Sequence, residues 1–377
     1  PQLLNQIGRG ISGEVLLIVG FEGPIPVVNA TVEAALPLLK SARDLGPDPG
    51  EQWYAHRHDV SYKLAPVFIA GAFADTMEVA ANWDRLPELY TSVQKALGRN
   101  AVVMAHFSHA YPEGCSIYFS FAGRGNLSVY DKTWREALSA AREAGGTVTH
   151  HHGVGALKAD AAAKEAGAAI RIWRDAKQRL DPKGIMNPGR PFPEEFEESS
   201  GPEHPPPSDG PVYSINTEAL LARVDPLADP QQIQATLTDS GYLLRILPDR
   251  PLLPWLQALQ RGSLSSWLSP LFGLQARFDD GATVQIFPAP RSAAGPDLRW
   301  GLLHSATIDW VEVAIRPADP DFIVSASHPS LDVRDVRPLW HSDEFWGLAP
   351  SQRAIAEHCF LQTHDGPLPS LPPESSS

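Results

Sequence analysis

Three consecutive histidines, His150 to His152, stand directly before the tripeptide Gly153-Val-Gly155. Imidazole changes its charge near neutral pH, so adjacent rings can transfer a proton or bind a metal ion. Paired glycines allow a sharp turn or a close approach of the backbone to a flat ligand. We interpret the segment first as an acid–base or cofactor-contacting site, second as a structural turn, and third as a metal site.

The backbone of this segment sets the expected directions of the rings. If residues 147–152 are extended, His150 and His152 share a face and His151 points away. A catalytic metal usually needs three protein ligands in a fixed geometry. Four other side chains could complete such a set: His106, His109, Asp75 and Glu78. No pattern in the sequence fixes a carboxylate beside the histidines, so we predict no metal ligands.

Tyr118 is the second candidate for chemistry. It stands in the strand-like segment 114–123, whose alternate residues on one face are all apolar: Ile117, Phe119 and Phe121. The apolar face predicts core, which places the phenol on the polar face, where it could donate a proton. The alternative is a tyrosine whose hydroxyl group meets only water.

Two further segments carry groups that could bind a ligand. Residues 56–63 (HRHDVSYK) include Arg57 and Lys63, which could hold a phosphate or carboxylate of the substrate, although a solvated loop would have the same composition. Residues 181–192 (DPKGIMNPGRPF) turn twice, and Asn187 lies between the turns, where it could hydrogen-bond a ligand ring.

The elements that would position these groups form a regular series before residue 193. Apolar patterns predict strands at 13–23, 71–81, 101–111 and 114–123, the last two as a hairpin. Helical spacing predicts helices at 25–46, 83–98, 131–146 and 159–180. Asp131 is the expected N-cap of the third helix. The series β-α-β-α-β-β-α is typical of an α+β fold, an antiparallel sheet with helices on one face.

A stretch rich in proline, serine and glutamate at 193–210 predicts an exposed linker. Before it we expect a first domain at 1–192, and after it a second at 211–325. The second domain includes a hairpin with Asp280-Gly281 at its turn. The remaining residues, 326–377, show no assignable elements and end in a tail with the composition of disorder.

The overall composition is that of a soluble globular protein. The 377 residues suit two domains, and 43% are hydrophobic. A net charge of −13 argues against a nucleic-acid surface, which needs clustered Lys and Arg. No apolar run reaches the ~18 residues of a membrane span, and no signal peptide is visible. Only two cysteines are present, so we expect a reducing, cytoplasmic location.

Four segments resemble, in this order, the C-terminal half of FAD-linked oxidases of the vanillyl-alcohol oxidase type: DTMEVAANWDRL, CSIYFSFAG, HHHGVG and LDPKGIMNPGRPF. The resemblance covers about residues 10–192 and is greatest to the alkyldihydroxyacetonephosphate synthases. It implies non-covalently bound FAD, Tyr118 as the acid–base residue, and the three histidines beside substrate and flavin. It also places Gly153 and Asn187 next to the cofactor.

The chain departs from this family in two places. The family's substrate-binding arginine lies in a Tyr-x-Arg-Asp segment, whereas this chain has the sequence SYKL there. Lys63 keeps the positive charge but cannot form the bidentate hydrogen bonds that arginine makes with phosphate. Residues 211–318 resemble a degenerate, partial FAD-binding domain. Its segment HSATIDW (304–310) lacks the glycines that, in the family's corresponding segment, let the backbone approach the cofactor. A complete FAD site could therefore need an upstream or separate domain.

Three functions are compatible with these observations. We expect a flavin-dependent oxidoreductase acting on a small hydroxy acid or similar molecule, in which Tyr118 moves the proton and His150 and His152 stabilise the developing anion. One alternative is a transferase of the synthase type, which uses FAD without net oxidation. The other is a non-catalytic subunit that has lost FAD. The sequence leaves open whether the chain forms a homo-oligomer or a hetero-oligomer.

Overall fold

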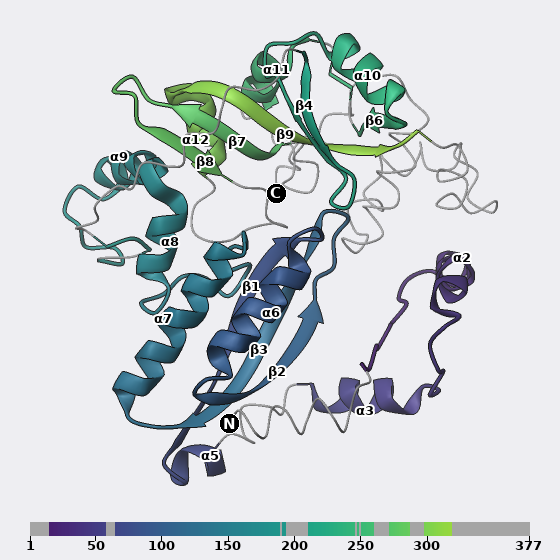
Figure 1. Ribbon diagram of the computed structural model, residues 1–377, viewed down its shortest axis with the longest axis vertical. Coiled ribbons are helices and arrows are strands. Elements are labelled where there is room, and N and C mark those ends of the chain that lie inside the picture. Colours follow the sequence, from purple (N-terminus) through teal and green to yellow (C-terminus); the bar gives the residue numbers. More distant parts are fainter. Residues whose placement is uncertain are drawn as a thin grey trace, which may run out of the picture.

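Figure 1 shows the computed structural model, which describes residues 15–57, 65–188, 191–193, 210–245, 247–248, 250–259, 271–286 and 298–318. Two regions follow one another along the chain, and each is an antiparallel sheet with helices packed against it. The predicted α+β class is therefore confirmed. The predicted linker and C-terminal stretch fall almost wholly outside the described residues.

The first sheet has the strand order β1-β3-β2, with both pairings antiparallel. Its strands are β1 (Ala72–Asn82), β2 (Ala101–Ser108) and β3 (Gly114–Arg124). The strand expected at 71–81 and the hairpin are confirmed. A half-buried strand requires apolar side chains at every second residue, so this alternation was enough to predict the strands.

Two helices cover one face of this sheet, namely α6 (Leu86–Leu97) and α7 (Leu127–Glu143). They bury the predicted apolar face of β3, whose core residues are Ile117, Phe119 and Phe121. Tyr118 therefore points to the opposite face, as expected. Helix α7 begins earlier than predicted, because the Asn126 side chain caps it by accepting the Val129 N–H at 3.2 Å. The expectation that Asp131 is the N-cap is wrong.

The helix expected at 159–180 is divided. Helix α8 (Ala159–Ala166) ends at Gly167, whose φ of +52° breaks the right-handed series. A single 3₁₀ turn (Gly167–Ala169) leads into α9 (Ile170–Leu180). The turn allows α9 to leave the first region and pack against the second.

The N-terminal segment differs most from the sequence expectation. Residues 15–22 form no strand with any of the described residues, and Val15 is 92% exposed, so the predicted buried strand at 13–23 is wrong for this part. Residues with a high strand propensity form a strand only where the edge of another strand is available for hydrogen bonding. Helix α2 (Ile25–Ala35) is shorter than expected, because Pro37 interrupts the α-helical pattern and a 3₁₀ turn follows. Helices α3 (Asp48–His56) and α5 (Ala65–Ile69) complete the segment.

The second sheet has the order β4-β5-β9-β7-β8, with β6 also pairing with β9. Its strands are β4 (Val212–Asn216), β5 (Leu221–Val224), β6 (Tyr242–Leu244), β7 (Leu271–Arg277), β8 (Thr283–Ile286) and β9 (Thr307–Pro317). Its helices are α10 (Pro230–Asp239), α11 (Leu252–Leu259) and α12 (Leu298–Ser305). The turn at Asp280-Gly281 is confirmed, with Gly281 at φ +85°.

The two regions pack together through α9 and α12. A Cβ placed at Gly301 would lie 2.6 Å from Ile172 Cγ2, so glycine permits the close approach of the helices. Arg171 also forms an ion pair with Asp280 at 2.7 Å. No helix in the described ranges is long and apolar enough to cross a membrane.

Candidate active site

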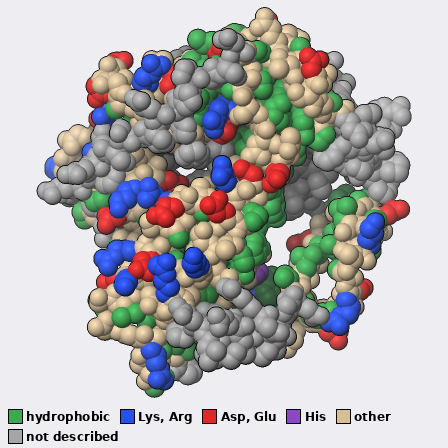
Figure 2. All heavy atoms as spheres, in the orientation of Figure 1, with side chains coloured by type: hydrophobic (Ala, Val, Ile, Leu, Met, Phe, Trp, Pro, Cys, Tyr) green, Lys and Arg blue, Asp and Glu red, His purple; other side chains and the backbone are tan. Residues whose placement is uncertain are grey.

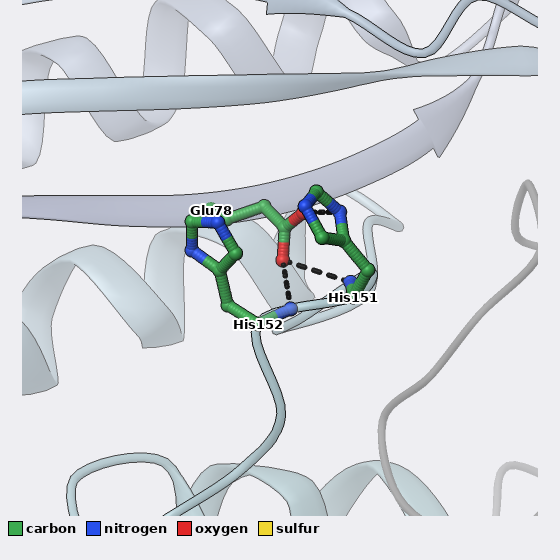
Figure 3. A group of neighbouring side chains, drawn as sticks. All are labelled: Glu78, His151 and His152. Atoms are coloured by element: carbon green, nitrogen blue, oxygen red, sulfur yellow. Dashed lines mark hydrogen bonds and ion pairs between the residues drawn. The ribbon is translucent and has the colours of Figure 1, made fainter. Parts of the chain in front are cut away.

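Glu78, on β1, is the buried centre of the site. Its side chain is 0% exposed, and its Oε2 atom accepts the backbone N–H groups of His150, His151 and His152, each at 3.0 Å (Figure 3). Burial acts to raise the pKa of Glu78, but hydrogen bonds from the His150 side chain and the three N–H groups hold this pKa well below its usual range. Glu78 is therefore a fixed anion at neutral pH.

The histidine segment wraps around this carboxylate. Thr147 pairs with Ala80 at the edge of β1, with an N–H···O distance of 2.8 Å, and the chain then bends so that successive N–H groups point inward. Gly153 (φ +78°) and Gly155 (φ +56°) turn the chain back. The prediction that His150 and His152 share a face, with His151 pointing away, is wrong because the segment is a loop and not a strand.

Tyr118, His151 and Glu78 form a continuous polar chain. Tyr118 and Glu78 are cross-strand partners of β3 and β1. The Tyr118 hydroxyl lies 3.1 Å from His151 Nε2, and His151 Nδ1 lies 2.5 Å from Glu78 Oε1. A hydroxyl, an imidazole and a buried carboxylate in this order can move a proton and stabilise the resulting imidazolium. We call this set the Tyr118–His151–Glu78 relay.

The pKa values of the relay set its protonation state at rest. Burial, together with the charge of Glu78, raises the pKa of Tyr118 to about 12, so the phenol is protonated at neutral pH. Burial lowers the pKa of His151, while Glu78 acts in the opposite direction. A neutral imidazole beside a protonated phenol can accept its proton. His151 is 43% exposed, so the middle member of the relay is accessible to a ligand.

Other imidazoles surround the relay. His150 is buried, its Nδ1 lies 3.1 Å from His151 Nδ1, and its Nε2 finds no hydrogen-bond partner among the described residues. His109 packs 4.7 Å from the His151 ring, and burial lowers its pKa. His106 and His152 contact the Tyr118 ring at 5.8 and 5.2 Å. These imidazoles come from two segments of the first region, namely β2 with the turn that follows it and the loop after α7.

Figure 2 shows how this side of the first region meets solvent. The surface is hollowed between the first region and the segment with α2 and α3, and a histidine side chain is visible there. No atom lies within 4 Å of a Cβ built at Gly153 or Gly155. The space beside these two glycines is therefore open among the described residues. Groups for the pyrophosphate are not identified among the residues described here.

No described contact joins the remaining predicted ligand-binding residues to the relay. Arg57 ends α3, where it contacts the Tyr54 carbonyl and lies 3.7 Å above the Tyr54 ring. Lys63 falls outside the described residues. Asn187 adopts φ +45° in the turn after α9, and the described contacts do not join it to the histidines. The ligand-binding roles of Arg57, Lys63 and Asn187 stay predictions.

Two buried residues were missed as members of the site. Glu78 was considered only as one of several carboxylates; its signal was a single acid within an otherwise apolar stretch of strand. Lys158 is 6% exposed, and its Nζ donates to the Glu78 backbone carbonyl at 2.9 Å. Burial lowers the pKa of Lys158 to about 8. Its position in sequence, directly before an Ala-rich helix, gave no sign of this contact.

The sequence of the first half matches a known family. Residues 8–190 match the profile described as FAD linked oxidases, C-terminal domain. The first half of this chain is thus similar to the C-terminal domain of FAD-linked oxidases. The relay, the surrounding histidines and Lys158 all lie within the matched residues.

Individual relatives of the first half support this similarity. The alkyldihydroxyacetonephosphate synthase of Dictyostelium discoideum is 29% identical over 199 residues, covering 49% of this chain and 33% of the synthase. The Trypanosoma brucei brucei synthase is 27% identical, covering 52% and 34%. The FAD-linked oxidoreductase YgcU of Escherichia coli O157:H7 is 23% identical, covering 48% and 42%. The chain thus spans about a third of the length of the two synthases.

A solved structure of an alkyldihydroxyacetonephosphate synthase also aligns with part of the chain. The alignment has 22% sequence identity and a TM-score of 0.33, and it covers 45% of this chain and 29% of the synthase chain.

Proposed function

We propose that this chain is the substrate-side part of a flavin-dependent oxidoreductase that acts on a small hydroxy acid or a similar alcohol. The observation that carries the proposal is the Tyr118–His151–Glu78 relay, in which the carboxylate is buried and the imidazole is partly exposed. Similarity to the C-terminal domain of FAD-linked oxidases supports FAD as the cofactor. When bound, the flavin would supply the two-electron acceptor.

The relay would remove the hydroxyl proton of the substrate. The substrate oxygen donates to Tyr118 Oη as Tyr118 passes its own proton to His151 Nε2, so Tyr118 ends the step protonated. His151 becomes an imidazolium ion, which Glu78 stabilises from 2.5 Å through its Oε1. Because Glu78 is fixed by three N–H groups, it needs little reorganisation during the step.

The surrounding groups would orient the substrate and the ring. Gly153 and Gly155 offer an open backbone surface against which a flat ring can lie. His109 and His152 flank the Tyr118 and His151 rings, where their N–H groups could bind the substrate's other oxygen atoms. The ammonium group of Lys158, which donates to the Glu78 backbone carbonyl, would stabilise the negative charge of Glu78.

A second candidate function is the transfer reaction of an alkyldihydroxyacetonephosphate synthase. The identity to two synthases favours it. The replacement of the family's substrate-binding arginine by Lys63 weighs against a phosphate-ester substrate. Oxidation of D-2-hydroxy acids would separate the two, because only the oxidoreductase reduces its flavin with them.

Reconstitution with FAD tests the proposal. The chain is titrated with FAD and followed by the visible absorption of the flavin, and the loaded protein is then mixed anaerobically with a panel of D-2-hydroxy acids. We expect saturable uptake of FAD and bleaching of its absorption by at least one acid. A chain that remains colourless, alone and with a co-expressed flavin domain, would instead support a non-catalytic subunit.

A further inference from the structure

One oxygen of Glu78, Oε1, meets only imidazole nitrogens in the described part of the chain: His151 Nδ1 at 2.5 Å and His150 Nδ1 at 3.5 Å. Oε2 accepts all three backbone N–H groups of the histidine loop, whereas Oε1 accepts none and is shielded from water. A buried carboxylate oxygen is costly unless a proton donor or a cation lies beside it. Oε1 therefore marks a position at which positive charge is stabilised.

Two exposed imidazoles flank this carboxylate. Figure 3 shows the His151 and His152 rings on opposite sides of the Glu78 carboxylate. His151 Nδ1 lies 2.5 Å from Oε1, and one ligand atom from each of the three residues falls within 4.8 Å of the others. Two imidazole nitrogens and one carboxylate oxygen are a donor set typical of Zn²⁺ and related transition-metal ions.

We propose that Glu78, His151 and His152 bind a divalent cation of the Zn²⁺ class through Glu78 Oε1, His151 Nδ1 and a ring nitrogen of His152. The carboxylate is already held by three N–H groups, so the ligand with the highest charge is fixed before the ion arrives. His152 is exposed, which gives the ion a path from solvent. Hard ions such as Mg²⁺ prefer oxygen ligands and would bind weakly.

The position of the ion has a consequence for the relay, and this consequence rests on the proposed function. An ion on His151 Nδ1 takes the place of the proton between Nδ1 and Glu78 Oε1. The remaining imidazole proton then resides on Nε2, the atom that faces the Tyr118 hydroxyl at 3.1 Å. His151 can no longer accept a proton from Tyr118, so the ion would inhibit turnover.

Metal binding is measured on the full chain without flavin. ZnCl₂ is titrated by calorimetry, and Co²⁺ is followed by its visible absorption. We expect one ion per chain, and a loss of affinity of at least about tenfold in His152→Ala. This variant keeps the backbone N–H that holds Glu78. His304→Ala, an exposed histidine on α12, is the matched control and should bind as the wild type does.

The outcomes separate this inference from the proposed function. Absence of binding, or equal affinity in wild type, His151→Ala and His152→Ala, overturns the metal site even if flavin reduction is observed. Binding that these variants weaken supports the site whether or not the chain turns over. If Zn²⁺ binds to the flavin-loaded chain without slowing turnover, the site stands and the assigned role of His151 Nε2 fails.

Discussion

Tyr118 and Glu78 occupy paired positions on β3 and β1, and the His151 ring connects the phenol of one to the carboxylate of the other. The sheet therefore sets the separation of the two outer members, while the loop after α7 supplies the middle one. The same loop donates three N–H groups to Glu78. The Glu78 carboxylate therefore holds the backbone that positions the His151 ring beside it.

Removal of the Glu78 carboxylate should unfold the site. In Glu78→Ala the N–H groups of His150, His151 and His152 lose their common acceptor, and each buried donor left unpaired costs about 1–3 kcal/mol. We expect the free energy of unfolding to fall by at least about 3 kcal/mol in urea titrations. Glu136→Ala on α7, which breaks only surface ion pairs, should lie within about 1 kcal/mol of wild type. Equal losses would contradict the anchoring role.

The turn at Gly153 should not accept a side chain without cost. Its φ of +78° is unfavourable for other residues by roughly 1–2 kcal/mol, although no atom would clash with a Cβ. Gly153→Ala should therefore lower the thermal midpoint and displace the histidine loop. Gly20→Ala, also in open surroundings but without a positive φ, should leave the midpoint unchanged. A neutral Gly153→Ala would show that the loop can turn in another way.

Alkaline conditions should destabilise the first region through Tyr130. Its hydroxyl donates to Asp75 Oδ2 at 2.5 Å, and burial, followed by this hydrogen bond, raises the pKa of Tyr130 above its usual value. Above pH ~10 the unfolded chain releases a proton that the folded chain retains, so the stability present at lower pH declines as pH rises. Tyr118 adds a contribution of the same sign.

Urea unfolding at a series of alkaline pH values measures this dependence. Tyr130→Phe should show a shallower decline than wild type, because it removes one of the groups with a raised pKa. Tyr54→Phe, an exposed tyrosine on α3, is the matched control and should decline as wild type does. An unchanged slope in Tyr130→Phe would mean that the Asp75 hydrogen bond is absent in solution.

The parts of the fold that depend on local pattern could be predicted from the sequence. Alternation in β3 placed Tyr118 on the polar face and Phe119 in the core, and the β2–β3 hairpin followed from the same period. The strand at 13–23 was wrong because pairing needs a free neighbouring edge, which no single segment encodes. Asp131 was the predicted cap, whereas Asn126 is the cap in the structure, and both residue types cap helices well.

The site was predictable in its residue types but not in its geometry. His151 and Tyr118 were both identified, yet their contact depends on a loop that closes around Glu78, more than 70 positions earlier in the chain. An extended backbone was assumed for the histidines, and this assumption directed His151 to the wrong side. Only the register of β1 against β3 shows that Glu78 lies opposite Tyr118.

Flavin reduction by substrate in Tyr118→Phe tests the central claim most directly. Wild type and variant are loaded with FAD and mixed with the same hydroxy acid under anaerobic conditions, with Tyr213→Phe on β4 as the control. Loss of the proton-transferring hydroxyl should slow reduction by about 10²–10⁴-fold while FAD binding is retained. A variant that reduces its flavin as fast as wild type would contradict the relay.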